Sequence, residues 1–329
     1  MKAIKPYAKI YDEKDNLKKI EAIGRTCYKS ESKIKSGSAK KFVANLVKRG
    51  HEAMLEHASF IFRMDMIPHF YFMELVKDLE SKVPEYKSYL RFTAENNRYI
   101  VSGNVRAWRD YMKTSMVINA EIPNFMQEFV FENPVFFPEY QDKTLFANAL
   151  VGYLKPMSVS ELEGLTEKLT HWDVTVKFVV DRGISHENVR HRPASFAQES
   201  TRYCNYAKDD FGGEITCIIP HYLVEGTVGM DIWKKAMKDA ESAYFDLLDW
   251  GCTAQEARGV LPHSLKTELF MTANLAEWKH FFYLRAANMT GKAHPQMLEV
   301  AVPLLEDMDA FAPDTLKDVV NLIVHCLWL

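Results

Sequence analysis

The chain has 329 residues, of which 47% are hydrophobic and 26% are charged, and its formal net charge is -3. These values are typical of a soluble globular protein, and the near balance of charge argues against a general nucleic-acid-binding or membrane-binding surface. The five cysteines include no Cys-x-x-Cys pair, and no segment has the composition of a signal peptide or a membrane span, so a cytoplasmic protein with free thiols is expected.

The first half of the chain predicts a helix, a strand and then a long mixed segment. Ser38–Arg49 has the spacing of an amphipathic helix, and Ala58–Met66 alternates apolar and polar residues as a strand does. Residues 68–172 carry no chemical motif and are predicted to form an inserted, mostly helical lobe with one short strand at Arg98–Ser102. The helical patterns within it are Tyr71–Leu79, Asn104–Thr114, Met116–Phe131 and Thr144–Leu154.

The second half predicts strands that alternate with longer helices. Asp173–Val180 and Glu214–Ile219 have strand patterns, and Ser264–Met271 alternates loosely. Pro303 is expected to kink or split its helix. This mixture predicts an α/β (α+β) fold with a mixed central sheet and long flanking helices. The predicted helices are Ile184–Arg190, Val228–Trp250, Thr253–Val260, Asn274–Asn288, Pro295–Ala310 and Pro313–Cys326.

The segment Arg190–Tyr203 has the strongest chemical signal. It contains three arginines, a histidine, two serines and a tyrosine within fourteen residues. Arginine presents a planar fork of donors that matches phosphate and carboxylate, and serine hydroxyls can complete such a cradle. The composition therefore favours a site for a planar anion, with a charged surface loop as the alternative. Its place after a strand, a glycine and a short helix favours the binding site.

Several other patterns are weaker. His186 and His191 suggest a zinc-protease pattern, but that pattern needs histidines four apart, and Arg190 occupies the required position, so no metal site is predicted. The chain has neither a Rossmann nor a P-loop glycine motif. His51 and His57 precede a predicted strand, and the residues alone do not decide whether these histidines are structural or catalytic.

One face of the predicted helix Asn274–Asn288 carries an amide, two aromatic rings and an arginine. These are Asn274, Trp278, Phe281 and Arg285, at helical spacing. A core stripe that ends in a partly exposed arginine is the simpler interpretation, and a functional face is the alternative.

Taken together, these segments resemble the flavin-dependent thymidylate synthases. Arg190-His191-Arg192, followed after seven residues by Ser200, matches the hallmark of that family. The supporting segments occur in the expected order, namely Gly50-His51-Glu52 to Glu56-His57, then Arg258 to Leu261-Pro262, Asn274 to Arg285, and the segment of Gln296. The resemblance implies a thymidylate synthase-complementing-protein type fold. It implies a core of residues 1–67 and 173–329, with 68–172 as an insertion to which it assigns no role.

The resemblance also implies an activity. Enzymes of this family methylate dUMP to dTMP with methylenetetrahydrofolate as the carbon donor, FAD as the hydride carrier and NADPH as the reductant. They are methyltransferases and homotetramers with active sites shared between subunits. The expected partners are therefore these small molecules and further copies of the chain, with neither nucleic acid nor membrane.

The same resemblance implies roles for individual residues. Arg285 is the expected catalytic residue. The expected dUMP-binding residues are Glu187, Arg190, Gln198, Glu199, Ser200, Arg202, Arg258 and Arg285. The expected FAD-binding residues are His57, Ser59, Arg190, His191, Arg192, Gln198, Asn274 and His280. Four positions depart from the shorter members of the family, which often have Gln, Glu, Arg and Asn in place of Glu187, Gln198, Ala276 and His280.

Two other classes of function remain as alternatives. The first is a nucleic-acid-binding module that uses the basic cluster Arg190–Arg202, whose binding would weaken steeply with salt. The second is a zinc hydrolase built around His186 and His191, which would require stoichiometric metal.

Overall fold

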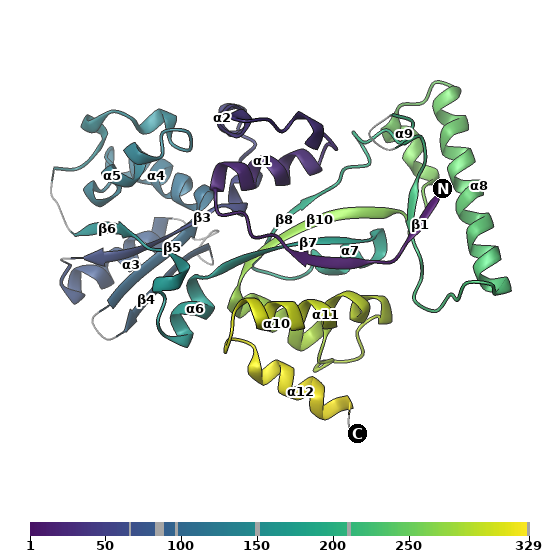
Figure 1. Cartoon of the computed structure of the whole chain (residues 1–329). Helices are drawn as coiled ribbons and strands as arrows, with labels where there is room; N and C mark the ends of the chain where they lie inside the picture. The colour runs from purple at the N-terminus through teal and green to yellow at the C-terminus, as the bar shows by residue number, and fades with distance from the viewer. Residues whose placement is uncertain (66, 83–88, 96–97, 149–151, 209–211, 328–329) are drawn as a thin grey trace.

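The computed structural model describes residues 1–65, 67–82, 89–95, 98–148, 152–208 and 212–327. In this part of the chain, two four-stranded sheets and a two-stranded ladder are surrounded by helices (Figure 1). The segments that carry the predicted site come from the central sheet, from its flanking helices and from the boundary between the two larger sheets.

The central sheet is antiparallel. Its strand order is β2 (Tyr7–Ile10), β7 (Asp173–Asp181), β10 (Lys266–Asn274) and β8 (Ser195–Gln198). Side chains alternate along a strand, so Phe178 and its partner Leu269 point to one face and Lys177 points to the other. The first face is apolar and the second carries charged groups, which gives the sheet two chemically different sides.

Helices cover both faces of this sheet. The apolar face is covered by α10 (Leu275–Arg285) and α11 (Pro295–Phe311), with α12 (Lys317–Leu327) packed outside them (Figure 1). Trp278 and Phe281 of α10 contact the ring of Phe178 there. On the opposite face, α1 (Asn16–Thr26) packs against β8 and β10, and α2 (Ser38–Lys48) packs against α1.

The second four-stranded sheet lies beside the central one. Its order is β4 (Leu90–Glu95), β5 (Arg98–Asn104), β3 (Ser59–Asp65) and β6 (Tyr153–Pro156), and all its pairs are antiparallel. Phe62, Trp108 and Phe129 meet edge to face in its core. The predicted lobe, residues 68–172, therefore shares its sheet with β3. Its helices are α3 (His69–Lys82), α4 (Val105–Asn119), α5 (Gln127–Glu132) and α6 (Leu165–His171).

A smaller unit lies at the other end of the central sheet. There β1 (Lys2–Ile4) pairs in parallel with β9 (Thr216–Ile218). The helices α8 (Val228–Asp249) and α9 (Ala254–Ala257) bury Met230, Tyr244 and Ala257 against this pair. The short helix α7 (Arg182–Asn188) directly follows β7.

Most predicted elements are confirmed within a few residues, and two predicted helices are wrong. The predicted helix Thr144–Leu154 contains a 3-10 turn at Lys143–Leu145, a bridge between Phe146 and Ile122, and the start of β6, while residues 149–151 lie outside the described part. The helix predicted at Met116–Phe131 is interrupted, because α4 ends at Asn119 with Ala120 in the left-handed region (φ 57°), and helical structure resumes only at Asn124, after Pro123. Conversely, α11 continues through Pro303 without a split.

The predicted α+β class is confirmed, and α8 and α11 are long flanking helices of 22 and 17 residues. The sheet type needs correction, because the only parallel ladder in the described residues is β1–β9 and the central sheet is antiparallel throughout. No helix in the described residues is long and apolar enough to cross a membrane.

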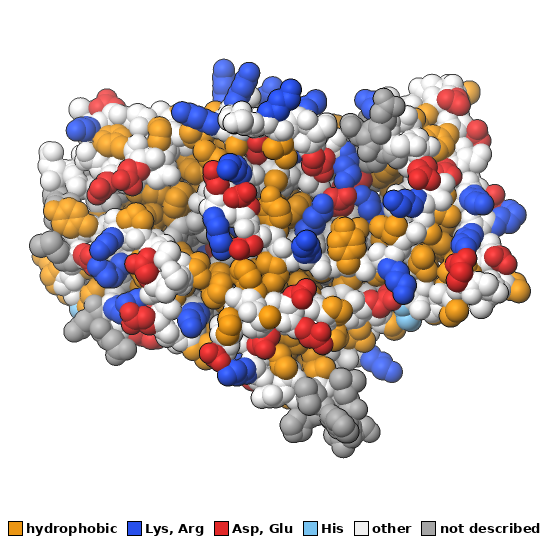
Figure 2. All heavy atoms as spheres, viewed as in Figure 1, with side chains coloured by type: hydrophobic (Ala, Val, Ile, Leu, Met, Phe, Trp, Pro, Cys, Tyr) orange, Lys and Arg blue, Asp and Glu red, His pale blue; other side chains and the backbone are white. Residues whose placement is uncertain are grey.

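Charge is unevenly distributed over the surface in Figure 2. Lys and Arg side chains gather along the edge formed by α2, whose Lys40, Lys41 and Lys48 are exposed. Elsewhere on this face, acidic and basic side chains are interspersed among apolar ones. The predicted site residues on the central sheet lie away from the α2 edge.

Candidate functional site

The segment Arg190–Tyr203 leaves the end of α7 and enters β8. Asp181 caps α7, since its Oδ1 accepts the backbone N–H of Ile184 over 2.7 Å, and Gln296 donates to its other oxygen. Burial raises the pKa of this carboxyl group. The cap fixes the start of α7 and thereby the direction in which the chain leaves it. Beyond α7, the side chains of Arg190 and Arg192 are exposed, and the guanidinium of Arg192 donates to Val189 O over 2.5 Å.

Arg285, at the C-terminal end of α10, contacts two other predicted site residues. Its Nη1 donates to Glu187 Oε2 over 2.7 Å, and its Nε donates to His191 Nε2 over 3.0 Å. The side chains of Arg285 and Glu187 are 21% and 32% exposed. The three residues come from α10, α7 and the following loop, so the fold brings together groups that are far apart in the sequence. His280, on the same helix, approaches the His191 ring at 6.5 Å between centroids.

These contacts determine the state of His191. Burial, with the nearby charges of Arg285 and His280, lowers the pKa of His191 to about 4. A guanidinium has donors only, so His191 Nε2 accepts and the proton of the neutral ring lies on Nδ1. His191 is therefore a neutral ring near pH 7, with its remaining donor directed away from Arg285.

Gln198 and Glu199 lie on opposite faces of the central sheet. Gln198 Nε2 donates to Ser185 Oγ over 2.8 Å and to Thr267 Oγ1 over 3.2 Å, on the side of α7. Glu199 is 1% exposed and pairs with Lys266 on the other face over 2.9 Å. Gln198 and Glu199 therefore do not line the same pocket within one chain.

On this second face, lysine side chains neutralise the charges of Glu199 and Glu268. Glu268 Oε1 accepts from Lys266 over 2.8 Å and also from Lys29, and its Oε2 forms an ion pair with Lys177 over 2.5 Å. Although burial opposes ionisation, these three cations hold the pKa of Glu268 well below its usual range. Lys266 contacts both Glu268 and Glu199, and its pKa is raised against the effect of burial.

The end of the segment Arg190–Tyr203, from Ser200 onward, is more exposed than Glu199. The backbone N–H of Ser200 donates to Cys27 O over 3.1 Å, which ties the loop to the end of α1. Ser200 Oγ accepts the N–H of Arg202 over 3.4 Å, a long contact that leaves the hydroxyl proton available. Arg258 Nη1 approaches Thr201 Oγ1 at 3.5 Å, and the side chains of Arg202 and Arg258 are both exposed. Ser200, Arg202 and Arg258 thus lie in one neighbourhood, apart from the Arg285 cluster.

His57 ends the 3-10 helix η2 (Glu52–His57) and is fully buried. Its Nδ1 lies 2.7 Å from Thr272 Oγ1, and its Nε2 has no partner in the described residues. Burial, together with the charge of Lys19, lowers the pKa of His57 to about 3. A neutral buried ring with one unused nitrogen can bind a neutral polar group of a ligand.

Ser59 and Asn274 lie where the central and second sheets meet. Ser59 Oγ donates to Asp173, which is opposite Asn274 in the β7–β10 register. Asp173 also accepts two hydrogen bonds from Arg91, over 2.5 and 2.7 Å. Burial works against ionisation of Asp173, but Arg91 and Ser59 lower its pKa. Asn274 caps α10 through its Oδ1, which accepts the N–H of Glu277 over 2.9 Å.

Several residues at these positions carry no signal in the sequence. Arg91 and Tyr89 come from the predicted lobe, Asp173 lies at the start of β7, and Lys19 lies on α1. Burial lowers the pKa of Lys19 to about 8. None of these residues belongs to a local motif, and side-chain contacts between distant segments, such as Arg91 with Asp173 and Tyr89 with Ala194, bring them to the site.

Three of the five thiols are poor nucleophiles in this structure. Burial raises the pKa of Cys27 to about 11 and those of Cys204 and Cys217 to about 12. These three thiols are therefore protonated near neutral pH. The side chain of Cys326 lies outside the described part of the chain.

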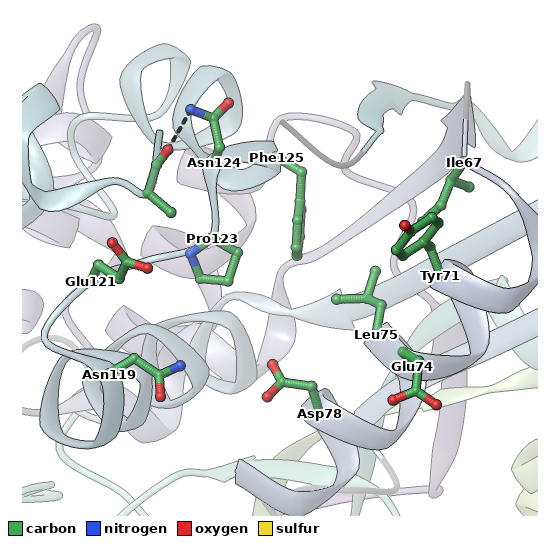
Figure 3. A pocket seen from close by; sticks show the side chains of 11 residues that line it. Ile67, Tyr71, Glu74, Leu75, Asp78, Asn119, Glu121, Pro123, Asn124 and Phe125 are labelled. Atoms are coloured by element: carbon green, nitrogen blue, oxygen red, sulfur yellow. Dashed lines mark hydrogen bonds between the residues drawn. The ribbon is translucent and has the colours of Figure 1, made fainter. Parts of the chain in front are cut away.

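A separate pocket lies inside the lobe, between α3 and the segment that follows α4 (Figure 3). Apolar Ile67, Leu75 and Phe125 line it together with the carboxylates of Glu74 and Glu121. No residue predicted to bind dUMP or FAD lines this pocket.

Ten of the predicted site residues therefore form three groups within one chain. Glu187, His191, His280 and Arg285 lie at the apolar-face helices, while His57, Ser59 and Asn274 lie at the junction of the two sheets. Ser200, Arg202 and Arg258 form the third group. Their assignment to particular ligands stays a prediction.

Comparison with known proteins extends this picture. A family model described as "Thymidylate synthase complementing protein" matches residues 9–86 and 158–314. A flavin-dependent thymidylate synthase of Pyrococcus furiosus is 37% identical over 127 residues, which is 39% of this chain and 50% of that protein. The one of Geobacter sulfurreducens is 32% identical over 139 residues, or 42% and 57% of the two chains.

The matches span about half the length of these curated relatives. Among solved structures, a UMP/dUMP methylase, PolB, from Streptomyces cacaoi aligns over 96% of both chains with 15% identity and a TM-score of 0.41.

Proposed function

We propose that this chain, which belongs to the thymidylate synthase complementing protein family, is an FAD-dependent methyltransferase that converts dUMP to dTMP. The carbon donor in this proposal is methylenetetrahydrofolate, and NADPH is the reductant. The observation that carries it is the placement of Arg285 beside Glu187 and His191, because this arrangement joins the predicted catalytic residue to the Arg-His-Arg motif.

Arg285 is suited to activating a pyrimidine. Methyl transfer requires C5 of uracil to become nucleophilic, which is favoured when negative charge builds on N3 and O4. Arg285 has a guanidinium nitrogen, Nη2, beyond those bonded to Glu187 and His191, and a preoriented donor stabilises charge that develops in the transition state. Glu187 and His191 hold the guanidinium in place before the substrate arrives.

No protein nucleophile is needed in this scheme. The protonated state of Cys27, Cys204 and Cys217 supports a reaction in which no thiolate attacks the pyrimidine. The uracil ring would then be activated by electrostatic stabilisation rather than by a covalent bond to the chain.

The residues present fit a flavin cofactor. His57 Nε2 is a buried polar atom without a partner in the described residues, and such an atom calls for a ligand or a water molecule. Ser59 and Asn274 supply neutral polar groups at the same junction, while the exposed Arg190 and Arg192 supply positive charge for a diphosphate. When bound, FAD carries the hydride that completes the methyl group.

The dUMP site in this proposal uses the remaining groups. Ser200, Arg202 and Arg258 would bind the phosphate, since they combine a free hydroxyl proton with two exposed guanidinium groups. Glu187, Arg190, Gln198 and Glu199 are carried over from the family, and the separation of Gln198 from Glu199 by the sheet makes Glu199 the weakest of these assignments.

The distribution of these groups supports a homotetramer with shared sites. Within one chain, the Arg285 cluster lies on the side of the central sheet that α10 covers, whereas His57 bonds to Thr272 and Ser200 bonds to Cys27 on the opposite side. A second copy of the chain would complete a site from surfaces that one copy leaves apart.

The visible absorbance spectrum of the purified protein tests the proposal. We expect a yellow protein with flavin bands that change on addition of dUMP, and oxidation of NADPH that depends on dUMP and folate together. A colourless protein that binds no added FAD would refute the proposal.

A further inference from the structure

The boundary between the two sheets is built largely by a stretch that the family match leaves out. The matched ranges end at residue 86 and resume at residue 158. Strands β4 and β5 and helix α4 lie in this gap. Side chains of Tyr89, of β4 and of α4 contact the segments that are assigned to FAD binding.

The strongest of these contacts is the pair of Arg91 and Asp173. Both guanidinium Nη atoms of Arg91 contact the carboxylate, over 2.5 and 2.7 Å, and both side chains are 11% exposed. Asp173 in turn accepts from Ser59 and stands opposite Asn274. A buried bidentate pair fixes both distance and orientation, so Arg91 determines where Ser59 and the β7–β10 end lie.

A second contact reaches the Arg-His-Arg loop. The hydroxyl group of Tyr89 donates to the backbone oxygen of Ala194 over 3.0 Å, two residues after Arg192. Tyr89 and Arg91 also line a narrow cavity together with Asp173, Ser195 and Asn274. The cavity therefore has one wall from the unmatched stretch and one from the family core.

Helix α4 holds the segment that carries His57. Arg109, which is 2% exposed, donates to Glu52 over 3.1 Å, and Arg106 pairs with Glu56 over 2.6 Å. Glu52 and Glu56 lie at the start and near the end of η2, whose last residue is His57. Two ion pairs from α4 thus fix both ends of this short helix.

We propose that Tyr89, β4 and α4, which lie in the stretch that the family match leaves out, position the FAD-binding segments of their own chain, with Arg91 as the positioning residue that orients Ser59 and Asn274 through Asp173. This inference rests on the proposed function. Its physical basis is preorganisation, because groups already held in the bound geometry do not lose further conformational freedom when the ligand arrives.

The test compares FAD binding by the full-length chain and three variants. Arg91→Met removes both hydrogen bonds, and Arg91→Lys keeps the charge without the planar fork. Arg63→Met is the matched control, because Arg63 makes a similar pair with Asp65, over 2.6 and 2.9 Å, on the same sheet but with 35% of its side chain exposed. Flavin is removed and then titrated back, and quenching of flavin fluorescence gives the dissociation constant.

All titrations are made at a temperature at which circular dichroism shows each variant to be folded. We expect the dissociation constant for FAD to rise at least about tenfold in Arg91→Met, less in Arg91→Lys, and not at all in Arg63→Met. A purely structural role would lower the melting temperature of the Arg91 variants without changing their affinity for FAD.

Removing Arg91 leaves the carboxylate of Asp173 without its cation, which is strongly destabilising for a buried group. If Arg91→Met does not fold, the double variant Arg91→Met/Asp173→Asn replaces it, since both partners are then neutral. Wild-type affinity in any folded variant that lacks Arg91 overturns the inference and leaves the proposed function intact. A wild-type chain that binds no FAD overturns the proposed function and this inference with it.

Discussion

Arg285 donates from Nε to His191 Nε2 over 3.0 Å, which joins the helix α10 to the loop between α7 and β8. The same guanidinium reaches Glu187. Arg285, which is assigned to the pyrimidine site, is therefore bonded directly to His191, which is assigned to the FAD site. A change in the position of either ligand would be felt by the other through this contact.

Replacing Arg285 with Ala should nearly abolish formation of dTMP while FAD stays bound. The reason is that Arg285 is the donor expected to stabilise charge on the uracil ring, whereas His57 and Ser59, which are assigned to FAD, bond to Thr272 and Asp173 rather than to Arg285. The measurement is single-turnover dTMP formation alongside the flavin spectrum. Near-normal turnover would exclude the role of Arg285, and wild-type activity in Arg285→Lys would show that its planar geometry is not needed.

Glu187→Gln should reduce kcat far less than loss of Arg285. The amide oxygen of Gln can still accept the hydrogen bond that Glu187 Oε2 now accepts over 2.7 Å, although the charge is lost. Glu187→Leu removes the acceptor and serves as the comparison. Steady-state kcat and KM for dUMP check this prediction, and equal losses in the two variants would contradict it.

Ser200→Ala should weaken dUMP binding only modestly. Its hydroxyl group makes one long contact, over 3.4 Å to Arg202 N, so its removal disturbs the loop little. A single hydrogen bond to a ligand contributes about 1 kcal/mol, so KM for dUMP should rise several-fold with kcat nearly unchanged. Steady-state kinetics at several dUMP concentrations measures this, and a loss as large as that of Arg285→Ala would assign Ser200 a different role.

The protein should lose stability as the pH falls below about 6.5, the ordinary pKa of histidine. Burial lowers the pKa of His57 and of His171 to about 3, and that of His191 to about 4. Between these values and 6.5 the unfolded chain binds more protons than the folded chain, so the free energy of unfolding decreases as the pH falls. Urea unfolding at pH 7 and pH 5 measures the decrease.

His171→Gln isolates one of these contributions. His171 is buried between Ser102 and Thr93, at 2.7 and 2.9 Å, and Gln retains polar atoms for both. The loss of unfolding free energy between pH 7 and pH 5 should be smaller by about 2 kcal/mol than in the wild type. The exposed His186, changed to Gln, is the control. An unchanged pH dependence in His171→Gln would show that His171 is not held neutral.

The sequence predicted the elements whose patterns are local. The alternation of Val174, Val176 and Phe178 marked β7, and the long amphipathic pattern after Thr227 marked α8, because burial of one face imposes a regular period. Short strands such as β4 and β8 were not predicted, since a few residues carry too little periodicity. The helix expected at Thr144–Leu154 was wrong because contact with distant Ile122 overrides local preference.

In the candidate site, too, local motifs were predictable from the sequence, whereas contacts between distant residues were not. The order of the Arg-His-Arg motif, His57, Arg258 and Arg285 is a property of the sequence and was sufficient to predict the family, because such motifs are local and ordered. That Gln198 and Glu199 face opposite sides of a sheet follows from their register with β10. The contact of Arg91 with Asp173 joins residues 82 positions apart, and only the packing of one sheet beside the other brings such residues together.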